Sequence, residues 1–356
     1  MKKGGLILLT TLLLTYGYQG YKILHNYIND EVKTKTSAVL SDITDNVISI
    51  PLEMPDSGFM RQIKRVQRDG NNIFLLSDRK LLHFDISGKY INQLAMDISN
   101  TKDAFIADYT IDTDRHQIIV IDSLRNISKY DYSGNLISRE RIIQPWNKIS
   151  AFIYHDGCLW ATAETLSKNT DNDSYNITKN LHQLDMDMYE ISSQKLHYAN
   201  VGRDIIFNSL CIDELLADED GVYAYSSPAD MKHLLNDTLF ILQNRNAPMT
   251  NKNGHHNQAC VYPIRKGKRY MMSTHSHSAD DCHTFCYDNS SNTAYLLSEG
   301  FKDDVYNTGY ITDMQPVDIY NTSYYYIKSE VEETTMLSGS NANKGNYTLY
   351  IATLKS

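Results

Sequence analysis

The sequence predicts an all-β domain built from repeated units of antiparallel strands, and three observations support this prediction. From residue 47 onward, short apolar runs of four to seven residues alternate with turn residues, as in strands joined by tight turns. Helical periodicity is nearly absent over the same region. A sequence pattern also recurs along the chain: a strand ends in an aromatic residue and an aspartate, and a Ser-Gly turn follows. The chain has 356 residues, of which 42% are hydrophobic, so it can bury a full core.

Two units show the repeat most clearly. An apolar strand at residues 73–76 leads to the segment 84–88 (Phe-Asp-Ile-Ser-Gly), and a strand at 118–121 leads to 130–134 (Tyr-Asp-Tyr-Ser-Gly). Glycine supplies the positive φ that a tight hairpin turn needs, and the aspartate can accept backbone N–H groups within the turn. The two segments therefore indicate the same hairpin in two successive units.

The same outline returns four more times in weaker form. These units contain the strand pairs 158–161 and 181–185, 221–225 and 237–241, 269–272 and 284–288, and 323–327 and 347–352. Six units over residues 63–356 give about 49 residues each, which is typical of one blade of a β-propeller. An additional strand at 47–52 precedes the first unit and is expected to cover the open edge of the last one. The predicted fold is thus a six-bladed β-propeller of four-stranded antiparallel blades, over residues 47–356, with an N-terminal strand closing the last blade.

The quoted segments resemble a known group of proteins. "ISIPL" at residues 48–52, "FDISGK" at 84–89, "YDYSGN" at 130–135, "NDTLFIL" at 236–242 and "YTLYIATLK" at 347–355 look like the six-bladed β-propeller proteins of Bacteroidetes. That group resembles NHL-type propellers and consists of exported proteins and lipoproteins, so the resemblance implies a fold and export but no activity. A glycine-rich stretch usual between early blades is replaced here by residues 97–105.

The N-terminus is predicted to carry an export signal. Two lysines precede an uncharged, apolar stretch from residue 4 to residue 15, which is the pattern of a signal peptide. Residues 1–24 are therefore predicted to be either a cleaved signal peptide or a retained signal anchor, and residues 25–46 a polar tether. No cysteine follows the apolar stretch, so a lipid anchor is not expected there. The predicted location is extracytoplasmic, in the periplasm or on a membrane facing it, with membrane contact if the segment is uncleaved.

Charge and cysteine content exclude some functions. The net charge is −9, which argues against a nucleic-acid partner because phosphate binding needs a basic face. The one basic run, residues 265–269, is interpreted as a solvated hairpin turn. Five cysteines at irregular spacing form no small disulfide framework and are predicted to be free thiols.

The densest group of metal-ligating residue types lies between residues 275 and 286. His275, His277, Cys282 and His283 could hold a transition metal such as zinc, since imidazole and thiolate are its preferred ligands. The alternative interpretation is a polar hairpin at the rim of the fifth blade whose composition is incidental. No other cofactor is expected.

No sequence motif indicates catalysis. The chain contains no nucleophile elbow, zincin motif, phosphate-binding loop or dinucleotide fingerprint. Two hypotheses remain open. The first is a binding or scaffolding propeller for a protein or carbohydrate ligand. The second is a propeller-type lyase or hydrolase with a site at the rim or channel. The histidines in or near blade strands would be candidates for the second hypothesis: His83, His116, His155 and His182.

Overall fold

The computed structural model describes residues 33–53, 63–77, 80–94, 105–168, 174–202, 213–218, 221–226, 238–242, 260–261, 265–278, 281–330 and 346–356. Apart from one turn of 3-10 helix, η1 (Leu40–Asp42), every regular element in these residues is a strand. None of the helical structure found there is long or apolar enough to cross a membrane. The predicted export segment, residues 1–24, lies outside the described residues.

The chain divides into two compact units, which are considered separately. One contains residues 40–142 and 303–355 and is called the closure unit, because it holds both the first and the last sheet strands of the repeat. The other contains residues 1–39, 143–302 and 356 and is called the middle unit.

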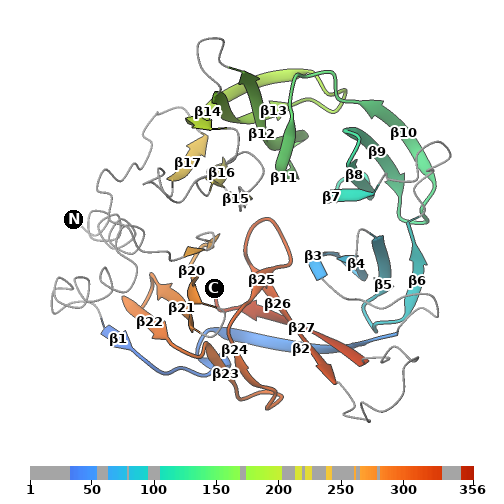
Figure 1. The fold of residues 1–356 in the computed structure, drawn as a ribbon. Coiled ribbons are helices and arrows are strands. Elements are labelled where there is room, and N and C mark those ends of the chain that lie inside the picture. Colours follow the sequence, from blue (N-terminus) through green and yellow to red (C-terminus); the bar gives the residue numbers. More distant parts are fainter. Residues whose placement is uncertain are drawn as a thin grey trace, which may run out of the picture. The chain divides into compact units, whose positions relative to one another are not determined.

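Three four-stranded antiparallel sheets form the closure unit (Figure 1). The first sheet has the order β3 (Ile63–Asp69), β4 (Asn72–Ser77), β5 (Lys80–Asp85) and β6 (Tyr90–Gln93). The second has β7 (Ile106–Asp112), β8 (Gln117–Asp122), β9 (Asn126–Asp131) and β10 (Leu136–Arg141). The third runs in the order β2 (Thr44–Leu52), β27 (Asn346–Leu354), β26 (Ser323–Glu330) and β25 (Gln315–Pro316). A short pair, β23 (Phe301–Asp303) and β24 (Gly309–Ile311), precedes β25.

Strand β2 closes the third sheet, as the sequence predicted. It pairs antiparallel with β27 from Thr44 opposite Leu354 to Leu52 opposite Tyr347. Its buried side chains Ile50 and Leu52 pack with residues of the third and first sheets in one hydrophobic cluster. A second cluster joins the first and second sheets. The strand therefore pairs with the backbone of β27, which would otherwise be an open sheet edge, and it also contributes to the apolar core.

The folded body begins before residue 47, within the predicted tether. Strand β1 (Lys33–Lys35) pairs in parallel with β22 (Thr293–Leu297) of the middle unit. In the closure unit, the side chains of Leu40 and Ile43 are fully buried. A polar segment can join the body in this way because backbone groups, not side chains, make the strand pairing.

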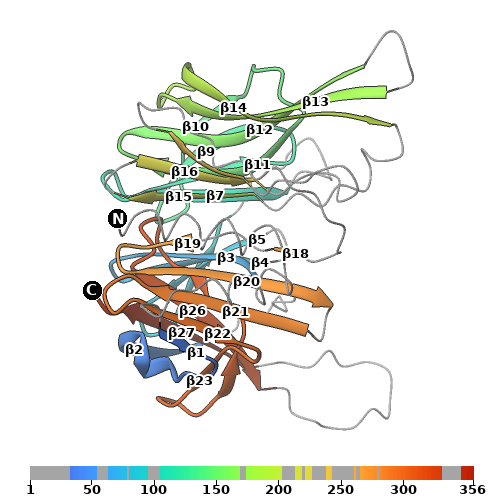
Figure 2. The same ribbon diagram turned by 90° about the vertical axis from the view of Figure 1, so that its left-hand side faces the viewer.

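The middle unit has three sheets, and the longest strands belong to the first of them (Figure 2). This sheet consists of β11 (Lys148–His155), β12 (Cys158–Lys168), β13 (Ser174–Leu184) and β14 (Glu190–Gly202). The next contains β15 (Asp213–Asp218), β16 (Gly221–Ser226) and β17 (Thr238–Leu242). The last contains β1, β22, β21 (Asp281–Asp288), β20 (Tyr270–Ser278), β18 (Cys260–Val261) and β19 (Arg265–Lys266), with β18 and β19 both paired to β20.

The predicted count of six four-stranded sheets is not reached. Five sheets have at least four strands, whereas the sheet at the fourth repeat, β15 to β17, has three strands in the described part of the chain. The fourth repeat lacks the aromatic-Asp-x-Ser-Gly turn, but so do the third, fifth and sixth repeats, so this signature does not single out the three-stranded sheet.

One aspartate-centred turn recurs far more often than the Ser-Gly signature suggests. In each copy the backbone N–H of the third residue after the aspartate bonds the aspartate carbonyl, and the N–H of the fourth bonds its Oδ1. The third residue takes a left-handed conformation in every copy. The aspartates, with these residues and their φ angles, are Asp85 with Gly88 (86°), Asp122 with Arg125 (66°), Asp131 with Gly134 (89°), Asp185 with Met188 (68°) and Asp318 with Asn321 (56°). The aspartate thus fixes the turn even where no glycine is present.

Substitution of Asp122, whose side chain is buried, tests how much this turn contributes to the stability of the protein. Its Oδ1 accepts the N–H groups of Leu124 and Asn126, both at 2.8 Å, and its Oδ2 accepts the Arg139 guanidinium at 3.1 Å. Asp122→Ala is expected to lower the free energy of unfolding by about 3 kcal/mol, because the two N–H groups and the Arg139 guanidinium lose a buried, charged acceptor. Urea unfolding would measure this. The same substitution at Asp131, which is only half-buried, is the control, and an equal loss at both sites would contradict the prediction.

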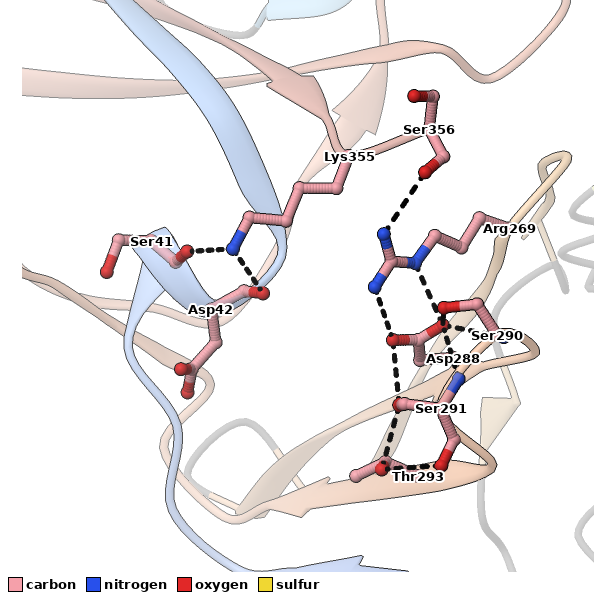
Figure 3. Close-up of polar contacts among 9 residues, drawn as sticks. All are labelled: Ser41, Asp42, Arg269, Asp288, Ser290, Ser291, Thr293, Lys355 and Ser356. Carbon is pink, nitrogen blue, oxygen red and sulfur yellow. Dashed lines mark hydrogen bonds and ion pairs between the residues drawn. The ribbon is translucent and has the colours of Figure 1, made fainter.

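The fifth repeat uses a salt bridge in place of the Ser-Gly turn (Figure 3). Arg269 binds the carboxylate of Asp288 through Nε at 3.0 Å and a terminal nitrogen at 2.9 Å. The same carboxylate accepts the Oγ hydroxyls of Ser290 and Ser291, each at 2.8 Å. The bonds from Arg269 and the two serines hold the pKa of Asp288 well below its usual range, against the opposing effect of burial.

Candidate functional site

The closure unit contains a cavity of about 320 Å³ that opens to solvent. It lies where β24, the segment before β25 and strand β26 meet the start of β3. Its lining residues are Ile63, Tyr310, Ile311, Thr312, Asp313, Gln315, Tyr325, Tyr326, Ile327 and Lys328. Gln315 is placed opposite Tyr325 by the β25–β26 pairing. The volume of the cavity lies at the lower end of the range of small-ligand sites, and its lining mixes apolar and polar residues.

Two of the residues that line this cavity, Tyr325 and Tyr326, are buried tyrosines. The ring of Tyr326 stacks on that of Tyr350, with 4.7 Å between the centroids and 5° between the planes. Its hydroxyl donates to Asp303 Oδ2 at 3.1 Å. Burial, followed by the negative charge of Asp303, raises the pKa of Tyr326 far above its usual value. The phenol therefore stays protonated, so it is suited to positioning and not to acting as a base.

The mouth of the cavity carries polar groups and one exposed ring. The side chain of Tyr310 is 50% exposed. Gln315 donates through Nε2 to both carboxylate oxygens of Asp313 at 2.6 Å. Lys328 donates through Nζ to the Tyr310 carbonyl at 2.9 Å. The mouth therefore presents an aromatic face, a carboxylate, an amide and an ammonium group within one short segment of chain.

Two of the predicted histidines lie on either side of Tyr132 in the closure unit. Asp69 Oδ2 accepts the Tyr132 hydroxyl at 2.6 Å and contacts His116 Nδ1 at 3.1 Å. Burial, with Asp69 adding to it, raises the pKa of Tyr132 far above its usual value. The ring of His83 stacks on Phe74, with 4.5 Å between centroids. This group joins the first and second sheets, and its tyrosine is a donor to a carboxylate and not an activated base.

His83 should make the stability of the protein depend on pH. Burial lowers its pKa below the ordinary value of 6.5, although the Tyr132 backbone and Asp85 act in the opposite direction. The folded state thus favours the neutral ring, so the unfolded chain binds more protons below pH 6.5. Stability is fully present above pH 6.5 and falls as the pH drops toward the folded pKa. Urea unfolding between pH 7.5 and 5.5 should show this fall.

His83→Gln supplies the control for that pH dependence. Glutamine can keep a polar contact to Asn72, whose Oδ1 lies 2.9 Å from the His83 ring, but it does not titrate. The variant should lose less stability between pH 7.5 and 5.5 than the natural protein. Equal losses in the two proteins would show that other groups cause the pH dependence; burial also lowers the pKa of His182.

The other two histidines lie in the middle unit, on the sheet β11 to β14. His155 ends β11 opposite Cys158. His182 lies in β13, where its Nδ1 is 2.6 Å from Glu190 and its ring packs against Trp146. His83 and His116 both contact Tyr132 in the closure unit, whereas His155 and His182 lie on one sheet of the middle unit.

The predicted metal-ligating residues lie on the hairpin β20–β21, described here by its backbone. His275 is opposite His283, and Ser276 is opposite both Cys282 on β21 and Cys260 on β18. The register shifts between Ser276 and Ser278, next to His277. Two of the predicted residues are thus direct cross-strand neighbours, whereas Cys282 belongs to the adjacent pair. Among the residues whose side chains are described, Cys158 and Cys286 are free thiols, as predicted.

Comparison with known proteins supports the fold. No protein-family model matches the chain, and no curated protein matches it. The chain is similar to the crystal structure of a "putative exported protein" from Bacteroides fragilis, with 12% identity and a TM-score of 0.58, over 91% of this chain and 99% of that one. It is more distantly similar to the WD40 domain of Neurospora crassa Pan2 (10% identity, TM-score 0.42, 82% and 75% coverage) and to the RRP9 WD40 repeats (10%, 0.43, 90% and 100%).

These observations define the class of protein. The chain is an all-β protein with a β-propeller fold and antiparallel four-stranded blades. The cavity residues, by contrast, were not predicted as a site from the sequence. Residues 323–327 were identified only as a strand, and no motif marks Asp313 or Gln315 as ligand-binding.

Proposed function

We propose that the protein is an extracytoplasmic, six-bladed β-propeller that binds a ligand in the cavity of the closure unit. One observation supports this proposal above all. The cavity combines an interior lined by buried tyrosines with a solvent-exposed mouth, where Tyr310, Asp313 and Lys328 present aromatic and charged groups. Binding sites need a preformed apolar surface and a few fixed polar groups. The sheet β15 to β17 provides the sixth blade in this proposal, since its three strands follow the same up-and-down order as the other repeats.

Export is supported by the apolar stretch at residues 4–15 and by the similarity in fold to a protein named as exported. Cell fractionation, with N-terminal sequencing of the mature protein, tests this part. Recovery in the periplasm or envelope fraction is expected, and the first residue distinguishes a cleaved signal from an anchor. Recovery in the cytoplasm with an intact N-terminus would overturn the proposed location.

Ligand binding is tested separately with the cavity variants. The purified full chain would be screened against mixtures of neutral sugars and of short peptides by thermal shift. A ligand that raises the melting temperature of the natural protein, but not that of Tyr310→Ala, supports the cavity as the site. Ligands that stabilise both proteins equally would place binding elsewhere, and no stabilisation by either mixture would overturn the proposed function.

A transition-metal site on the hairpin β20–β21 is a second candidate, favoured by the placement of His275 opposite His283. A cross-strand pair brings two residues within about 5.5 Å, close enough to share an ion. Metal analysis of the purified protein should then show a stoichiometric metal that is lost when both residues are replaced by alanine. Equal metal content in the natural and substituted proteins would overturn this site.

A further inference from the structure

We infer that the ligand of this cavity is a neutral carbohydrate, with one pyranose ring packed against the exposed face of Tyr310. The inference rests on the proposed function, because it specifies the ligand class of the same cavity. Three features of the cavity mouth support the inference: its aromatic surface, its hydrogen-bonding groups and its balance of charge.

The exposed ring of Tyr310 is the first part of the argument. Tyr310 is 50% exposed to solvent, although its backbone is held in place. Its carbonyl accepts the ammonium group of Lys328, and the neighbouring Ile311 is buried. The ring is therefore an apolar surface on a fixed backbone. An aromatic face carries negative charge density and favours contact with polarised C–H groups, which one face of a pyranose ring presents in a row.

The polar groups beside Tyr310 are the second part of the argument. Asp313 accepts hydrogen bonds, Lys328 donates them, and the amide of Gln315 does both. The two bonds from the Gln315 amide to Asp313 fix the carboxylate and the amide relative to each other. Neighbouring hydroxyls of a sugar each donate and accept one bond, so they can engage such a mixed set. A purely apolar ligand would leave these polar groups without compensation for their lost water.

Charge is the third part of the argument. The mouth contains one carboxylate, Asp313, and one ammonium group, Lys328, so its own charges cancel. The whole chain is acidic, with a net charge of −9, and therefore disfavours polyanions. These charges select a neutral ligand over an acidic polysaccharide. A cavity of about 320 Å³ that opens to solvent can hold a terminal sugar unit while the rest of a longer chain stays outside.

Calorimetric titration of the full chain with neutral monosaccharides and disaccharides tests the inference. The panel would contain glucose, galactose, mannose and N-acetylglucosamine, with a uronic acid to test charge. At least one neutral sugar should bind, and the uronic acid should bind more weakly. Tyr310→Ala is expected to weaken binding about tenfold because the aromatic contact is lost, and Asp313→Ala should also weaken it.

Tyr320→Ala is the matched control, because Tyr320 is 49% exposed in the same segment but does not line the cavity. It should bind the sugar like the natural protein. Absence of binding by every neutral sugar, or equal weakening by Tyr310→Ala and Tyr320→Ala, would overturn the inference. If short peptides bind in a Tyr310-dependent manner and sugars do not, the carbohydrate inference fails while the proposed binding function stands. If neither class binds, both fail.

Discussion

Gly88→Ala is expected to lower the free energy of unfolding by about 3 to 5 kcal/mol, combining a left-handed conformation with a steric clash. Gly88 has a φ of 86°, and an added Cβ would lie 2.0 Å from the carbonyl oxygen of Pro51 in β2. The backbone has little freedom to move away, because the N–H of Glu53 donates to the Gly88 carbonyl at 2.8 Å. Chemical denaturation of the purified protein measures the loss.

Gly134→Ala is the matched control for this prediction. Gly134 occupies the same position in the next repeat, with a φ of 89°, but its nearest neighbour would be 3.9 Å from an added Cβ. This substitution should cost only about 1 to 2 kcal/mol, from the backbone conformation alone. The difference between the stability losses of the two variants measures the steric effect of the close approach between the first hairpin and β2. Equal losses would show that this approach is not tight in solution.

Removing residues 1–53, and with them β1, η1 and β2, is expected to abolish cooperative unfolding of the closure unit. The deletion leaves β27 with an unpaired edge along its full length, and it removes Ile50 and Leu52 from the core shared with the first sheet. Exposed edges and apolar surfaces of this kind promote association. Thermal melting followed by circular dichroism should show a broad, early transition, and size-exclusion chromatography should show oligomers.

A protein lacking only residues 1–32 is the control, since it keeps every described strand. It should remain monomeric in chromatography and melt in one sharp transition. Adding a synthetic peptide of residues 44–52 to the longer deletion should restore part of the cooperativity by refilling the edge. A sharp, unchanged transition in the longer deletion would contradict the structural role assigned to β2.

The strands and their hairpins could be predicted from the sequence because the signals are local. Alternation of apolar residues and the turns at Asp85 and Asp131 depend on neighbours within a few positions. The closing strand was also predictable, since one apolar strand remained unmatched before the first repeat. The turns at Asp122, Asp185 and Asp318 were not recognised, because their left-handed residue is not glycine and only the aspartate reveals them.

The candidate site could not be predicted, for a physical reason. Ile63 in β3 lies more than two hundred positions before the other lining residues, which fall between 310 and 328, and no local pattern records that these residues meet. The contact of Tyr132 with Asp69 shows the same limit, because a tyrosine after an aspartate reads as turn chemistry. The start of the folded body was placed too late for a different reason. Residues 33–35 pair through their backbone and are exposed, so they carry no apolar signal.

The pairing of β2 with β27 also governs when the protein can fold. Lys355 binds the carbonyl oxygens of Ser41 and Asp42, the latter 313 positions earlier in the chain (Figure 3). At typical rates of synthesis, about 15 to 60 s therefore pass between the synthesis of β2 and that of its partner β27. Contacts over such separations form slowly, because a very long loop must close first. The third sheet therefore stays incomplete until the last strand of the chain has been made.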